Sequence, residues 1–162
     1  MTDLIVVTFD DMVEAEKALE SLKSLGQEGM ASIKDSAVVV KDESGEVHVK
    51  NKADTGEKWG AFGGSLVGLM IAGIFFPIAG LAIGAGIGAL IGKMAHLNVD
   101  QKMVKEVREN MKPGSSALFV MVSGDPGLIV AAFRPYQGTL FQTTLPTEQM
   151  EALEDALKGP IN

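Results

Sequence analysis

An uncharged run constrains this chain more than any other feature, because residues 59–92 contain no charged side chain and a lysine stands at each end. One membrane-spanning helix needs roughly 20 apolar residues, and at about 1.5 Å per residue this run would make a rod of roughly 50 Å. One straight helix is therefore a poor fit. Proline removes a backbone donor and disfavours helix in the residue before it. The sequence thus predicts a helical hairpin with its turn at Phe75, Phe76 and Pro77.

Glycines recur every fourth residue in both predicted arms, which would span about residues 60–74 and 78–92. In a helix this spacing forms one stripe of small residues, where a second backbone can approach closely. Glycine in a helix interior costs on the order of 1 kcal/mol relative to alanine, so only close packing could offset several of them. We expect the stripes to pack against the opposite arm or a second copy of the chain. The stripes consist of Gly60, Gly64, Gly68, Gly80, Gly84, Gly88 and Gly92.

The predicted arms are short for a membrane span. About 15 residues make roughly 22 Å of helix, whereas the hydrocarbon core of a bilayer is roughly 30 Å thick. The hairpin could thin the bilayer, re-enter it, or form the buried centre of a soluble oligomer. We expect membrane association, with Lys58, Trp59 and Lys93 as anchors at the interface.

Composition excludes several functional classes. The 162-residue chain has no cysteine, which excludes disulfides, thiolate metal sites and cysteine nucleophiles. Its net charge of −7 divides into −6 over residues 1–58 and −1 over residues 93–162, and the acidic surface argues against nucleic-acid binding. The chain opens with acidic residues and a short apolar run rather than a signal peptide, so we expect both flanks to lie in the cytoplasm.

The flanks of the uncharged run read as one mixed α/β unit. Apolar periodicity and turn residues predict strands at 4–9, 37–40, 47–49, 116–122 and 138–145, and helices at about 11–25, 98–111, 128–133 and 147–157. This order predicts an α+β fold with a ferredoxin-like βαββαβ sheet, an inserted apolar hairpin and an added C-terminal helix. Residues 1–58 and 93–162 would be its two halves, and 59–92 the hairpin. If both halves share one sheet, the hairpin crosses a membrane either twice or not at all.

The sequence resembles a bacterial family, domain of unknown function family 1269. The resemblance covers nearly the whole chain and is carried by structural motifs: LIVVTFD from Leu4, the helix pattern EAxxALxxL from Glu14, IKDSAVV from Ile33, the glycine-striped hairpin, and PGSSALF from Pro113. Members are described as predicted membrane proteins, which implies a bacterial plasma membrane location. The resemblance implies no activity, cofactor or catalytic residue.

No group of residues in the sequence indicates catalysis, a cofactor or a metal. His48 and His96 lack a ligand partner at helical or turn spacing, so we interpret them as a strand and an interfacial side chain. The pair Asp10–Asp11 is interpreted as a helix cap rather than a cation site. Turn or edge roles are the simpler interpretation of two further groups, Asp125–Gly127 at a strand end and Arg134 with Tyr136, which could otherwise line a ligand pocket and bind an anion.

Three functional hypotheses remain open. The first is a non-enzymatic, membrane-associated homo-oligomer, whose hairpin packs through its glycine stripes while a cytoplasmic domain mediates assembly or binds an unknown protein partner. The second is a soluble oligomer that buries the hairpin and binds lipid or another apolar ligand. The third is a small-molecule sensor with Asp125–Gly127 in its pocket.

Overall fold

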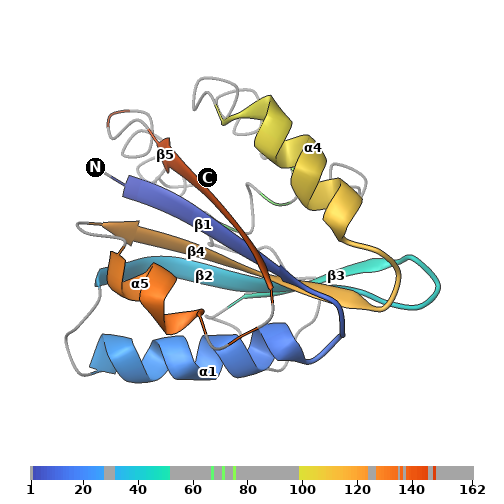
Figure 1. Ribbon diagram of the computed structural model, residues 1–162, viewed down its shortest axis with the longest axis horizontal. Helices are drawn as coiled ribbons and strands as arrows, with labels where there is room; N and C mark the ends of the chain where they lie inside the picture. Colours follow the sequence, from blue (N-terminus) through green and yellow to red (C-terminus); the bar gives the residue numbers. More distant parts are fainter. Residues whose placement is uncertain are drawn as a thin grey trace, which may run out of the picture.

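The computed structural model describes residues 2–27, 32–51, 67, 71, 75, 99–123, 127–134, 136, 138–145 and 148. Within these residues the fold is α+β, with a five-stranded antiparallel sheet and helices on both of its faces (Figure 1). The elements are β1 (Thr2–Phe9), α1 (Glu14–Gln27), β2 (Ser32–Lys41), β3 (Val47–Asn51), α4 (Gln101–Asn110), β4 (Ser115–Ser123), α5 (Gly127–Ala132) and β5 (Thr139–Leu145).

The strand order is β3-β2-β4-β1-β5, so strands from both flanks of the uncharged run share one sheet. β4 lies at the centre, where Phe119 pairs with Val6 of β1 and with Ala37 of β2. Residues 117–122 are each at most 1% exposed. A strand covered on both faces needs apolar side chains at successive positions, and β4 meets this requirement. The shorter β3 alternates apolar and polar residues and lies at one edge, beside β2.

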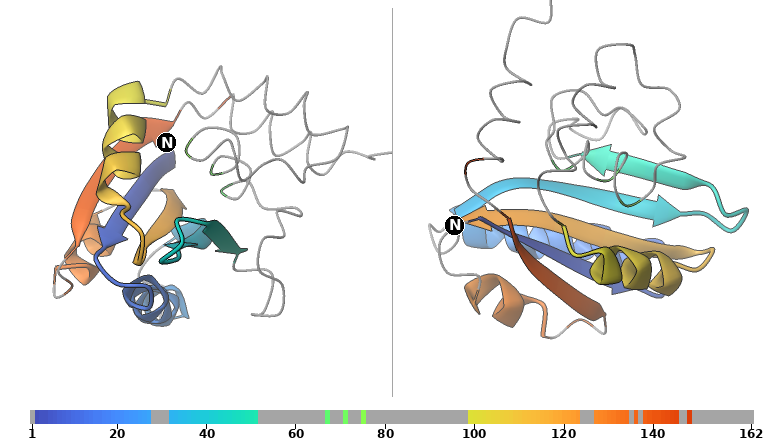
Figure 2. Two further views of the ribbon diagram at one scale, coloured as in Figure 1. Left: turned by 90° about the vertical axis from the view of Figure 1, so that its right-hand side faces the viewer. Right: turned by 90° about the horizontal axis from the view of Figure 1, so that it is seen from above.

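One face of the sheet, the α1 face, is covered by α1 and α5 (Figures 1 and 2). α1 begins as the sequence predicts, because Asp11 Oδ1 accepts hydrogen bonds from the backbone N–H groups of Val13 (2.9 Å) and Glu14 (2.7 Å). The buried residues of this face come from alternate strand positions and from the apolar sides of the two helices: Ile5, Val7, Phe9, Val38, Val40, Leu118, Val120, Val122, Ala15, Ala18, Leu22, Ile129 and Phe133.

The opposite face, the α4 face, is covered by α4 and by three residues of the uncharged run. The helix predicted from about residue 98 begins at Gln101, and its N-cap is Asp100, whose side chain accepts from the N–H of Lys102 at 3.0 Å. The buried members are Leu4, Val6, Ala37, Val39, Ala117, Phe119, Met121 and Leu145 of the sheet, Val99, Met103, Val104, Val107 and Met111 in and beside α4, and Val67, Ile71 and Phe75.

The part of the chain described here contains no helix that is both long enough and apolar enough to cross a membrane. Most of the predicted hairpin, including the seven glycines of its two stripes, Phe76, Pro77 and the anchors Lys58, Trp59 and Lys93, lies outside the described residues. Phe75, which the sequence placed in the hairpin turn, is in helical conformation and is 0% exposed.

Candidate functional site

The first candidate site is the contact between the uncharged run and the α4 face. Val67, Ile71 and Phe75 are helical, follow one another at intervals of four residues, and are each 0% exposed. Residues four apart lie on the same side of a helix. Fully burying side chains of this size contributes about 1.5–3 kcal/mol each, so three of them are comparable to a large part of a domain's net stability. These three residues of the run are therefore part of the core of the folded domain.

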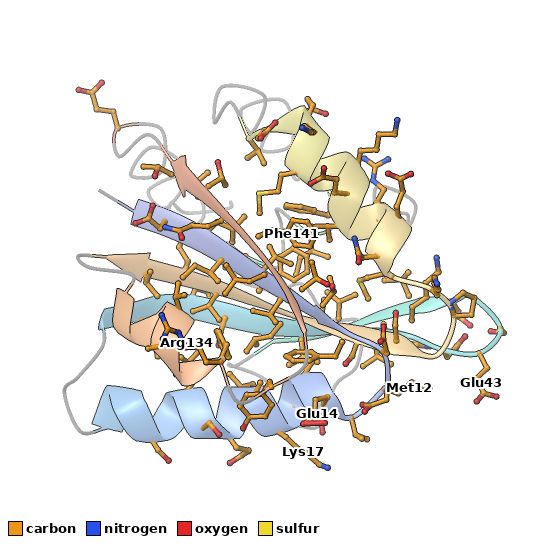
Figure 3. All side chains as sticks on the ribbon, viewed as in Figure 1. Met12, Glu14, Lys17, Glu43, Arg134 and Phe141 are labelled. Carbon is orange, nitrogen blue, oxygen red and sulfur yellow. The ribbon has the colours of Figure 1, made fainter. Side chains whose placement is uncertain are left out.

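An aromatic pair lies at the centre of this contact. The rings of Phe75 and Phe119 have centroids 4.9 Å apart and meet at 77°, an edge-to-face arrangement. Ala37 is the register partner of Phe119 on β2, and it is also fully buried on the α4 face. A small residue on the neighbouring strand leaves room for the second ring. Phe141 of β5 is partly buried against the same cluster and lies toward α4 (Figure 3).

A carboxylate of the sheet contacts the uncharged run at Val67. Asp35 Oδ2 accepts a hydrogen bond from the backbone N–H of Val67 at 3.0 Å, while its Oδ1 accepts one from the N–H of Ser36 at 2.9 Å. The pairing of β2 with β4 is irregular between Ile33 and Asp35, where the register advances by two residues on β2 against one on β4. Such a bulge redirects the side chains that follow it. Because Asp35 now pairs with Met121 of the α4 face, its carboxylate reaches the arm.

This site is built for packing and positioning. It combines apolar side chains, one aromatic pair and one charged hydrogen-bond acceptor, and hydrogen bonds to a charged acceptor are stronger than those between neutral groups. The sequence prediction included Phe75 for a different role, and it missed Asp35, Val67 and Ile71. The four-residue spacing of Val67, Ile71 and Phe75 was a signal for a buried helix face. The glycines recur at the same spacing, and the prediction used them instead.

The second candidate site lies at the tip of the β2–β3 hairpin. Asp42 N–H donates to Glu46 O at 2.9 Å, which closes the turn, and His48 follows two residues later. Asp42 Oδ2 and His48 Nε2 are 2.9 Å apart, and one ligand atom each from Asp42, Glu46 and His48 lie within 4.8 Å of one another. His48 lies on β3, as the sequence predicts, and the structure adds Asp42 as its neighbour. The cross-strand pairing supplies the neighbours that linear spacing did not indicate.

Hydrogen bonds hold the Asp42 carboxylate in its charged form. Its Oδ1 accepts from Ser44 Oγ, from the N–H of Ser44 at 3.0 Å and from the N–H of Glu46 at 2.9 Å. The Ser44 hydroxyl and then His48 contribute most to lowering the pKa of Asp42 well below its usual range. The half-exposed group is thus ionised and fixed in orientation at neutral pH.

The remaining predicted groups take structural roles or lie outside the described residues. The Tyr136 hydroxyl is 2.6 Å from Ser21 Oγ, and its ring meets Phe9 edge to face at 6.2 Å, so it joins the segment after α5 to α1. Arg134 is exposed beside α5 (Figure 3). Asp11 caps α1, as predicted. His96, Asp125 and Pro126 lie outside the described residues.

Comparison with known proteins identifies the family. A family described as "Protein of unknown function (DUF1269)" matches residues 58–158, which include the uncharged run, α4, β4, α5 and β5. The chain therefore belongs to this family. No curated protein and no solved structure matches the chain.

Proposed function

For this member of the family, we propose a non-enzymatic function in which the chain forms a homo-oligomer on a membrane and its α/β domain holds the first arm of the apolar run. The supporting observation is that Val67, Ile71 and Phe75 are buried in the domain core, while the run continues without charge to residue 92. In this proposal the first arm of the run does not move independently of the domain. The domain faces the cytoplasm and is available for assembly or for a protein partner.

Residues 76–92 are the part of the run that the proposal assigns to the membrane and to other copies. Seventeen residues in a helix reach about 25 Å, less than the roughly 30 Å of a hydrocarbon core. A shallow or re-entrant insertion fits this length better than a full crossing. Because β1 and β4 come from opposite flanks and pair in one sheet, the run begins and ends on the same side of any membrane.

The two glycine stripes then have different partners. Gly60 and Gly64 precede Val67 by seven and three residues, so we assign them, on a helical arm, to the side that faces the domain. The stripe of the second arm, Gly80 to Gly92, is the one we assign to contacts between copies. This assignment refines the expectation that both stripes face other helices.

A ferredoxin-like arrangement is part of the proposal. Without β3, the sheet order β5-β1-β4-β2 and the position of α1 and α5 on one face support two halves, β1-α1-β2 and β4-α5-β5. The sequence interpretation used residues 47–49 as the third strand of the βαββαβ pattern. In the proposed arrangement β4 is the third strand, and β3 is an additional strand at the edge of the sheet. On this view, β3, the apolar run and α4 form one insertion. Fold analogy adds no function.

Cell fractionation followed by measurement of particle mass tests the proposal. The full chain should sediment with membranes at high speed, remain there after a high-salt wash, and give an oligomeric mass by native mass spectrometry in mild detergent. Substituting Gly84 and Gly88 with leucine should lower that mass towards the monomer. Substituting Gly60 and Gly64 with leucine is the matched control. This variant should have a lower free energy of unfolding but should keep the oligomeric mass of the wild type. An unchanged mass in the Gly84/Gly88 variant would refute the assigned interface.

The second candidate is a soluble oligomer that buries the whole run and carries lipid or another apolar ligand. The burial of Val67, Ile71 and Phe75 favours it, because these side chains are removed from water by the protein itself and not by lipid. Recovery of the chain in the high-speed supernatant without detergent, together with extractable lipid in the purified particle, would select this candidate over the first.

A further inference from the structure

We propose that the tip of the β2–β3 hairpin binds a divalent transition-metal ion through Asp42 Oδ2, a carboxylate oxygen of Glu46 and His48 Nε2. One ligand atom from each of the three residues lies within 4.8 Å of the others, and Asp42 Oδ2 is 2.9 Å from His48 Nε2. The proposal is independent of the membrane proposal, since the hairpin tip and the α4-face contact with the apolar run involve different residues. Zn²⁺ is the ion with which the proposal is tested.

The ligand chemistry fits such an ion. One imidazole nitrogen with two carboxylates is a donor set for first-row divalent metals, and Zn²⁺ binds nitrogen and oxygen at about 2.0–2.2 Å. Two atoms 2.9 Å apart, as Asp42 Oδ2 and His48 Nε2 are, can both contact one ion at that distance. The ion would bind the lone pair of His48 Nε2, and the neutral ring would then carry its proton on Nδ1.

The turn prepares Asp42 for this role. Its Oδ1 is occupied by hydrogen bonds from Ser44 and Glu46, so the carboxylate keeps one orientation while Oδ2 faces His48. A flexible ligand would lose side-chain entropy on binding, and a fixed one loses less.

The position of Glu46 distinguishes a metal site from a simple ion pair. Asp42 and Glu46 face each other across the hairpin, and like charges at opposed positions destabilise a strand pair. An ion pair between Asp42 and His48 explains their 2.9 Å contact. It does not explain why the carboxylate of Glu46 also lies near these two side chains. A bound cation would convert that repulsion into coordination.

Isothermal titration of the full chain with Zn²⁺ tests the proposal. We expect one saturable site whose affinity falls at least about tenfold in His48→Gln and in Glu46→Gln. The matched control is Glu43→Gln, which removes the same charge from the same exposed turn and should leave the affinity within about twofold (Figure 3). Nuclear magnetic resonance of ¹⁵N-labelled histidine should show the Nε2 signal of His48 shifting with Zn²⁺.

Three results would overturn the proposal. The first is the absence of a saturable site. The second is unchanged Zn²⁺ affinity in His48→Gln, which would place the ion elsewhere. The third is an equal loss in Glu43→Gln and Glu46→Gln, which would indicate diffuse attraction to a negative turn rather than coordination.

Discussion

The ring of Phe75, from the uncharged run, meets the ring of Phe119, at the centre of β4, with centroids 4.9 Å apart and planes at 77°. Both side chains are 0% exposed. Residue 119 belongs to the central strand of the domain, and residue 75 belongs to a run whose composition is typical of a membrane segment. The contact therefore joins the two parts of the chain that the sequence suggested were separate.

Removing the Phe75 ring should destabilise the whole domain. Truncation of a buried phenylalanine to alanine typically costs about 3–5 kcal/mol, and we expect Phe75→Ala to lower the free energy of unfolding by an amount in that range. Urea denaturation followed by circular dichroism measures it. Val13→Ala is the control, because Val13 is 54% exposed and its truncation should have little effect. If the Phe75→Ala chain is as stable as wild type, Phe75 does not pack in the domain core.

A double-mutant cycle isolates the aromatic contact. We expect Phe75→Ala and Phe119→Ala together to cost less than the sum of the single changes, with a coupling of about 0.5–1.5 kcal/mol, because edge-to-face rings attract beyond their buried area. Leucine variants serve as a second pair if the alanine variants do not fold. Strict additivity would mean that the rings do not touch in solution.

Asp35 should stabilise the uncharged run at Val67. Asp35→Ala leaves the N–H of Val67 without its acceptor, and a buried donor left unsatisfied costs about 1–3 kcal/mol. Hydrogen exchange should show faster exchange of the Val67 amide than in wild type. Asp10→Ala is the control, since Asp10 is exposed just beyond β1. Equal exchange of the Val67 amide in both variants would contradict the assigned role.

Gly138 is required by close packing before β5. A Cβ at this position would lie 2.8 Å from the carbonyl oxygen of Thr8 and 2.8 Å from a methyl carbon of Val7. The backbone oxygen cannot rotate away, so we expect Gly138→Ala to cost about 1–3 kcal/mol of unfolding free energy. Gly45→Ala offers a comparison, because nothing lies within 4 Å of a Cβ there and its cost comes from a φ of +91°. A tolerated alanine at 138 would show that β5 packs less closely against β1.

Asp42 should make the stability of the hairpin depend on pH. Its pKa is lowered in the folded state, chiefly by the Ser44 hydroxyl, so its contribution is fully present above the unfolded pKa near about 4 and is lost as the pH falls towards the folded value. Denaturation of wild type and Asp42→Asn should show a difference that is largest at neutral pH and shrinks below about pH 4. Glu43→Gln should show no comparable convergence. A difference that grows on acidification would have the wrong sign.

Much of the α/β domain could be predicted from the sequence. The strands were found because β-branched residues cluster in short runs, and Asp11 was found because an acidic cap precedes an amphipathic helix. Boundaries were less certain: β2 begins at Ser32, five residues before the predicted strand, because the polar residues before Ala37 include the bulge. Pairing was hardest to predict, since β4 lies between β1 and β2 through contacts between residues far apart in the chain.

The candidate sites depended on tertiary contacts that linear patterns do not encode. Hydropathy gives Val67, Ile71 and Phe75 the same apolar character in lipid and in a protein core, so composition alone could not reveal that they face the sheet. Asp35 looks like an ordinary polar residue before a strand until the bulge directs it towards Val67. His48 lacked a partner in the sequence, because Asp42 reaches it across a hairpin rather than along a helix.

The most direct measurement is a nuclear Overhauser experiment on the full-length chain with selectively labelled phenylalanine, assigned by Phe75→Leu and Phe119→Leu. Because the ring centroids lie 4.9 Å apart, a cross-peak between the ring protons of Phe75 and Phe119 is predicted. It should persist when lipid nanodiscs are added, since the first arm stays on the domain. Absence of this cross-peak, with Phe75 ring protons contacting lipid acyl chains instead, would contradict the placement of the arm in the domain core.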